Sequence, residues 1–119
     1  MQRFKVTQQE LPSGDRDIQV QGELDLAVAA ELDEVLTAAA GECSCVLVGL
    51  ASCAFIDSSG IAVLLRAHNR IADEGGRFAV YGPTDQVLRV FSMTGLLNNG
   101  LVFDNAEEAL SAAGEPANS

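Results

Sequence analysis

The residues of this sequence that are best suited to chemistry form one short run, Asp57-Ser58-Ser59-Gly60. An apolar stretch ends at Asp57, two hydroxyls follow, and a glycine opens an amphipathic segment, an order that predicts a serine at the exposed start of a helix. Such a position offers backbone N–H groups without partners and the positive end of the helix dipole, and both favour a phosphate. A phosphate on Ser58 adds about −1.5 to −2 charges at pH 7. We therefore predict that Ser58 is a phosphorylation site that switches a protein interaction.

Two other interpretations of this run stay open on local grounds. Asp57, Ser58 or Ser59 could simply cap the helix, while Gly60 permits the turn. Ser59 is also a second candidate phosphoacceptor, because its hydroxyl lies directly beside Ser58. The local sequence thus predicts a helix start more strongly than it predicts phosphorylation at that start.

The net charge narrows the class of partner. The 119 residues carry a formal charge of −10 at pH 7. Nucleic acids and anionic membranes bind basic surfaces, so we expect neither as a direct partner. An acidic surface suits a basic protein partner or serves solubility alone. Because the sequence has no apolar stretch of roughly 20 residues and no secretory signal at its N-terminus, we expect a cytoplasmic protein.

The cysteines and the single histidine are the other reactive side chains. An odd count of cysteines (Cys43, Cys45 and Cys53) without a secretory signal argues against a disulfide framework. Their spacing is not that of a zinc knuckle or a redox pair, so we expect no metal and no cofactor, and a redox role stays open. A nucleophilic pair of Cys53 and His68 would need an orienting group and an oxyanion site. We therefore do not expect an enzyme.

The elements that must position these residues alternate between strand and helix. This alternation predicts a single α/β domain with a mixed, mainly parallel sheet of about five strands, flanked by about four helices. Asp25 and Asp104 are the expected N-caps of two helices, with Glu107 at the capping-box position, and Gly41 is expected to end the first helix. We expect strands over 4–7, 18–22, 45–50, 77–81 and 101–103, and helices over 26–40, 58–74, 84–91 and from 105 onward.

Three segments together resemble the STAS-domain anti-sigma factor antagonists, also called anti-anti-sigma factors. Phe55–Ile61 looks like the signature of that family, Gly22–Asp25 is similar to its second signature, and Phe91–Leu96 is similar to its phenylalanine-x-x-x-glycine-leucine segment. The three segments follow the order of the family. The resemblance implies one STAS-like domain over residues 1–113 and a short flexible tail over 114–119.

The resemblance also implies a mechanism. The unphosphorylated antagonist binds an anti-sigma factor, which is a serine kinase with a histidine-kinase-like ATPase fold, and a sigma factor is released. The kinase phosphorylates the serine directly after the aspartate, here Ser58, and the complex separates. A PP2C-type phosphatase resets the switch. The antagonist itself supplies no catalysis and is a monomer when free.

The same resemblance suggests which residues contact the partner. If Asp25 and Ser58 lie at the same end of a parallel sheet, Glu23, Asp25 and Asp57 form an acidic patch that a basic partner can reach. The sequence departs from the family at Gly49, near the expected end of the third strand, where an aspartate or asparagine is frequent. The predicted partner-binding residues are Glu23, Asp25, Asp57, Ser59, Gly60 and Ile61.

Two alternative functions remain at this stage. The first is a STAS subunit of a lipid-trafficking or stress-sensing complex without sigma-factor control. The second is a receiver-like domain with Asp57 as phosphoacceptor, which would need an acidic metal-binding pair near the first strand and a late lysine. Lys5 is the only lysine, so the sequence disfavours the receiver.

Overall fold

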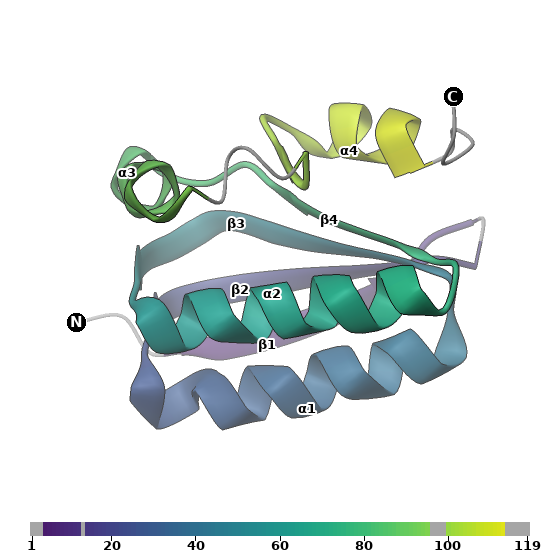
Figure 1. Ribbon diagram of the computed structural model, residues 1–119, viewed down its shortest axis with the longest axis horizontal. Helices are drawn as coiled ribbons and strands as arrows, with labels where there is room; N and C mark the ends of the chain where they lie inside the picture. Colours follow the sequence, from purple (N-terminus) through teal and green to yellow (C-terminus); the bar gives the residue numbers. More distant parts are fainter. Residues whose placement is uncertain (1–3, 13, 96–99, 114–119) are drawn as a thin grey trace.

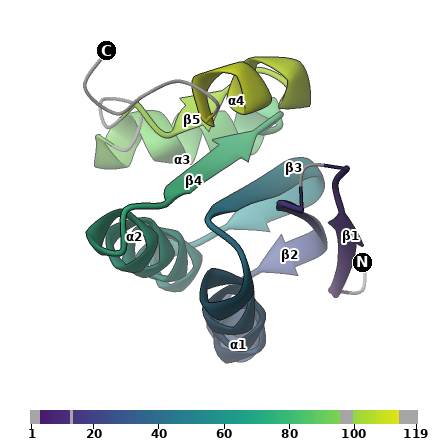
Figure 2. The same cartoon turned by 90° about the vertical axis from the view of Figure 1, so that its right-hand side faces the viewer.

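The computed structural model describes residues 4–12, 14–95 and 100–113. Over these residues a five-stranded sheet carries α1 and α2 on one face and α3 and α4 on the other (Figures 1 and 2). The elements in chain order are β1 (Lys5–Glu10), β2 (Arg16–Leu24), α1 (Leu26–Glu42), β3 (Cys45–Ile56), α2 (Ser58–Asp73), β4 (Arg77–Tyr81), α3 (Asp85–Thr94), β5 (Val102–Phe103) and α4 (Ala106–Ala113). The predicted single α/β domain with a mixed sheet is confirmed. The segments 96–99 and 114–119, which include the end of the third family-like motif and the predicted tail, lie outside the described residues.

The spatial order of the strands equals their order in the chain. β1 pairs with β2 in antiparallel fashion, whereas β2, β3, β4 and β5 run parallel to one another. Each parallel connection contains a helix, as the βαβ geometry requires. As a consequence, the carboxyl ends of β2 and β3 and the first residues of α1 and α2 meet at one end of the molecule (Figure 1).

Two apolar cores hold these elements in place. The larger core lies mainly between the sheet and α1 and α2, where Leu32, Leu36 and Leu64 are fully buried, and it also includes Val87 and Phe91 of α3. The smaller core lies under α4, where Ala109 packs with Cys45 and Leu47 of β3. Among the described residues no polar or charged side chain is classed as buried. Packing of apolar faces therefore holds the helices against the sheet.

The third strand is longer than predicted. β3 continues six residues past Leu50 to Ile56, because two irregularities in its pairing let it follow β2 beyond the apolar run. Gly49 therefore lies in the middle of β3 and not near its end. A Cβ there would lie 2.6 Å from the Gln19 side chain, which bonds to Asp17 and to the Tyr81 hydroxyl. A larger residue at position 49 would therefore displace the end of the Gln19 side chain from this network.

The predicted end signal of α1 and the predicted cap of α4 are wrong, and α3 runs to Thr94, past its predicted end at residue 91. Gly41 does not end α1, because it keeps helical geometry and the helix runs to Glu42, with Cys43 in extended conformation after it. The cap of α4 is Asn105 and not Asp104: its side-chain oxygen accepts from the Glu108 amide at 2.9 Å. Glu108, and not Glu107, therefore occupies the third helical position that a capping box uses. None of the helices in the described part of the chain has the length and apolar character that crossing a bilayer requires.

Candidate protein-interaction site

Ser58 is the first residue of α2, and its side chain is exposed. Ser59 is half-buried, whereas Gly60 and Ile61 are buried in the larger core. The structure thus brings the four residues together at the start of one helix but at different depths. Ser58 is on the surface, and Gly60 and Ile61 lie beneath it, so a partner can reach those two only through the surface that they support.

Gly60 is the position that lets α2 start so close to the sheet. A Cβ on Gly60 would lie 2.7 Å from Cγ of Leu24 and 2.8 Å from Cγ1 of Ile56, both of which are fully buried. These two residues are register partners at the ends of β2 and β3. Because only a hydrogen fits in that space, the glycine holds the first turn of α2 against the ends of both strands.

Asp57 is the N-cap of α2, and both oxygens of its carboxylate accept hydrogen bonds from backbone amides. Oδ1 accepts from the amides of Ser59 at 2.9 Å and Gly60 at 3.2 Å. Oδ2 accepts from the amide of Leu26, the first residue of α1, at 3.2 Å. The prediction of unpartnered N–H groups beside Ser58 is therefore wrong for Ser59 and Gly60, because the carboxylate of Asp57 takes the place that an anion would occupy.

The three predicted acidic residues differ in their surroundings. Asp25 caps α1, with Oδ1 accepting from the Ala27 amide at 3.1 Å, and it is half-buried, as is Asp57. Glu23 is exposed near the end of β2, where it pairs in register with Phe55. All three lie at the end of the sheet that carries Ser58. Two of the carboxylates serve the helix starts, which leaves Glu23 as the acidic side chain of the three that is fully exposed.

Sequence reasoning missed the exposed apolar side chains near this end. Leu26 is 76% exposed and Phe55 is 37% exposed. On α3, which also lies at this end of the molecule (Figure 1), Met93 is 79% exposed. Leu26 could have been found from the sequence, because it precedes the apolar stripe of its helix and does not share that face. Phe55 could not, since its side of β3 depends on the irregular register.

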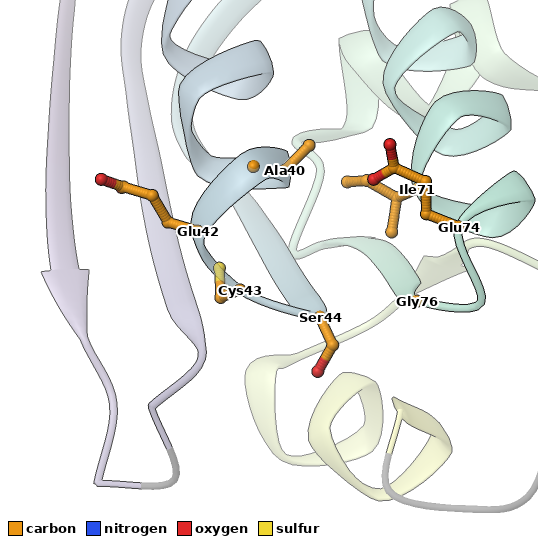
Figure 3. Close-up of a pocket in the computed structure, with 8 residues that line it drawn as sticks. Ala40, Glu42, Cys43, Ser44, Ile71, Glu74 and Gly76 are labelled. Carbon is orange, nitrogen blue, oxygen red and sulfur yellow. The ribbon is translucent and has the colours of Figure 1, made fainter.

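A cavity of about 300 Å³ lies at the opposite end of the molecule, between the last turns of α1 and α2 (Figure 3). Glu42, Cys43, Ile71 and Glu74 line it. It is separated from Ser58 by the length of α2, so it contributes nothing to the site described above. Among the residues that the structure describes, no group of three or more histidine, cysteine, aspartate or glutamate side chains is arranged to hold a metal ion.

The cysteines and the histidine lie in buried or half-buried positions. Cys45 and Cys53 are buried and Cys43 is half-buried, and all three are free thiols. Burial raises the pKa of the Cys53 thiol, so it is protonated at neutral pH and a poor nucleophile. The His68 ring lies 6.4 Å from the Phe78 ring, and its Nδ1 is buried without a hydrogen-bond partner. The Cys53 thiol donates to the Phe55 carbonyl oxygen at 3.3 Å.

Comparison with known proteins gives a family and a set of structures of the same fold. The family model described as "Mlab, STAS domain" matches residues 7–103. An anti-sigma factor antagonist from Mycobacterium paratuberculosis is similar, with a TM-score of 0.82 and 23% identity over 93% of this chain and 96% of that one. No curated protein matches the sequence.

Two structures of the antagonist SpoIIAA share the fold as well. Its unphosphorylated form has a TM-score of 0.76 and 21% identity over 91% of this chain and 95% of that one. The phosphorylated form of the Bacillus protein has a TM-score of 0.69 and 21% identity over 92% of this chain and 98% of that one. These likenesses show that the chain shares the fold of these proteins.

Proposed function

Because this chain belongs to the STAS domain family, we propose that it is an anti-sigma factor antagonist that is switched by phosphorylation of Ser58. In its unphosphorylated form it binds an anti-sigma factor with serine kinase activity, and a sigma factor is freed. A PP2C-type phosphatase restores the unphosphorylated form. The proposal places the protein in the cytoplasm, as a monomer when free and without a catalytic role of its own.

One observation carries the proposal: the hydroxyl that follows Asp57 is exposed at the first position of a rigidly held helix. A kinase needs a hydroxyl that it can reach, and Ser58 provides one. Ser59 is a poorer acceptor, because it is half-buried and its amide is bonded to Asp57. The geometry therefore favours Ser58 over Ser59 as the phosphoacceptor.

The transfer step changes the charge of this surface. The Ser58 oxygen attacks the γ-phosphorus of ATP held by the kinase, a new O–P bond forms, and the bond to the ADP oxygen breaks. The serine proton passes to a base of the kinase, and ADP leaves. The phosphate adds about −1.5 to −2 charges beside Asp57. Disrupting a charged contact in an interface typically costs about 2–5 kcal/mol, or roughly 30- to 5,000-fold in affinity, which suffices to separate the complex.

The experiment compares Ser58→Ala and Ser58→Glu proteins as baits in lysate of the native host, with captured proteins identified by mass spectrometry. We expect the alanine form to retain a histidine-kinase-like anti-sigma factor and the glutamate form to lose it. Ser44→Ala and Ser44→Glu are the matched controls, because Ser44 is exposed beside the cavity at the opposite end of the molecule, and both should retain that protein. Equal capture by the two Ser58 variants would exclude Ser58 as the switch.

A second candidate function is a STAS subunit of a lipid-trafficking or stress-sensing complex without sigma-factor control. The matching family model is described by the name Mlab and not by sigma-factor control, which supports testing this candidate. In that case both Ser58 baits would capture the same proteins, none of them a histidine-kinase-like anti-sigma factor. Ser58 would then be no more than the first residue of α2.

A further inference from the structure

Leu26 is an exposed apolar residue that one hydrogen bond links to Asp57, the residue before Ser58. It is the first residue of α1, and 76% of its side chain is exposed. Its amide donates to Oδ2 of Asp57, the residue directly before Ser58. The first turn of α1 contains no acidic residue, and Ala27 beside Leu26 is exposed as well. The exposed Leu26 side chain thus belongs to a residue whose backbone is bonded to the neighbour of Ser58.

The two carboxylate oxygens of Asp57 accept hydrogen bonds from two different helices. Oδ1 caps α2 through Ser59 and Gly60, and Oδ2 bonds to α1 through Leu26. Residues 26 and 57 are far apart in the sequence, and the parallel pairing of β2 with β3 brings them together, with Leu24 opposite Ile56. One carboxylate therefore fixes the position of Leu26 relative to Ser58.

We propose that Leu26 belongs to the same partner-binding surface as Ser58, and that Asp57 holds the two side by side. This inference rests on the proposed function. The partner that binds this surface is the anti-sigma kinase, which receives Leu26 in an apolar recess. Protein interfaces place apolar residues at the centre and polar residues at the rim. Leu26 supplies the apolar centre, and Glu23, exposed at the end of β2, supplies a negative rim that suits lysine or arginine around that recess.

The first test needs no partner and uses Asp57→Asn. Asparagine is as good an N-cap as aspartate, so its single side-chain oxygen can keep the bonds to Ser59 and Gly60. Its NH₂ group then faces the Leu26 amide, and two donors cannot bond to each other. We expect the Leu26 amide proton to exchange about tenfold faster in Asp57→Asn, measured by NMR, while the Gly60 amide is unchanged.

The matched control is Asp25→Asn, which changes the cap of α1 itself. Asp25 accepts from the Ala27 amide through a single oxygen, Oδ1. Asparagine can supply that oxygen, so both Leu26 and Ala27 amides should exchange as in the wild-type protein. An unchanged Leu26 amide in Asp57→Asn would overturn the coupling through Asp57, whatever the partner of the protein proves to be.

The second test measures binding of the anti-sigma kinase that the Ser58→Ala bait retains. By calorimetry we expect Leu26→Ala to weaken binding about tenfold. Leu110→Ala, which trims another exposed leucine on α4, should leave the affinity unchanged. If Asp57 acts by positioning Leu26, the effects of Asp57→Asn and Leu26→Ala on affinity should not add in the double variant.

The outcomes separate this inference from the proposed function. If Ser58→Ala binds the kinase but Leu26→Ala binds it equally well, the surface does not include Leu26 and the inference fails alone. If Leu26→Ala instead changes the sedimentation of the free protein, Leu26 faces a second copy of the chain and the inference is also overturned. If no Ser58 variant binds such a kinase, the proposed function itself fails.

Discussion

Asp57 decides what a phosphate on Ser58 can do. Since its carboxylate already accepts from Ser59 and Gly60, the phosphate cannot take those amides without displacing it. Because the Ser58 side chain is exposed, a phosphate on it would extend into solvent. At the scale of single residues, we therefore expect a change of surface charge and not a change of fold.

Ser58→Glu tests, in the absence of a partner, whether a negative charge at this position leaves the fold unchanged. A negative charge at the first helical position is favoured by the helix dipole and disfavoured by Asp57, and both effects are small at an exposed site. We expect the free energy of unfolding, measured by urea denaturation, to change by less than about 1 kcal/mol. A much larger loss would show that Ser58 supports the fold.

Gly60→Ala tests the close approach of α2 to the strand ends. The added Cβ would press on Leu24 and Ile56, neither of which is free to move in the core. Overpacking of this kind costs about 1–3 kcal/mol of unfolding free energy. Gly41→Ala is the control: it adds the same methyl group to α1, where nothing lies within 4 Å, and it should be neutral or stabilise by up to about 1 kcal/mol. Equal losses in the two variants would contradict the steric explanation.

Most elements could be predicted from the sequence because their signals are local. The apolar run at Cys45–Leu50, the alternation at Ile18 and Val20, and the capping residue Asp25 each lie within or directly beside the element that they define. The length of β3 could not be predicted, since it depends on irregular pairing with β2. The double role of Asp57 was missed for the same reason, because only the register of two strands brings Leu26 to its carboxylate.

The corrected start of α4 can be tested on that helix alone. Asn105→Ala removes the side chain that accepts from the Glu108 amide, and losing a cap costs about 1 kcal/mol. Asp104→Ala should change the unfolding free energy by less than about 0.5 kcal/mol, because Asp104 is exposed and does not cap the helix. Chemical denaturation of the two variants in parallel decides between them, and the reverse order of losses would restore Asp104 as the cap.

At the scale of the whole molecule, buried thiols set the response to alkaline pH. Burial raises the pKa of the Cys45 thiol from 9.0 to about 11, and burial also raises the pKa values of Cys43, Cys53 and Tyr81. Below pH 9 the thiol is protonated in both states and its contribution to stability is fully present. As the pH rises from 9 toward 11, the unfolded chain loses this proton first, so unfolding becomes easier.

Urea denaturation under reducing conditions checks this prediction. We expect the wild-type protein to lose stability between about pH 8 and about pH 10.5, and Cys45→Ala to lose less over the same interval, whatever its stability at the lower pH. Comparing the losses and not the absolute values removes the cost of trimming a buried side chain. An equal loss in both proteins would show that Cys45 does not contribute to the alkaline transition.

The parallel course of α1 and α2 has a consequence for how the molecule approaches a partner. Both helices start at the Ser58 end and finish beside the cavity at the other end, along a molecule 39 Å long (Figure 1). Their dipoles therefore add, and each is equivalent to about half a charge at either end. The carboxylates of Asp25 and Asp57 cap these two positive ends and offset them. The long-range field at the Ser58 end is therefore set by side-chain charges in a chain of net charge −10, and not by the helix dipoles.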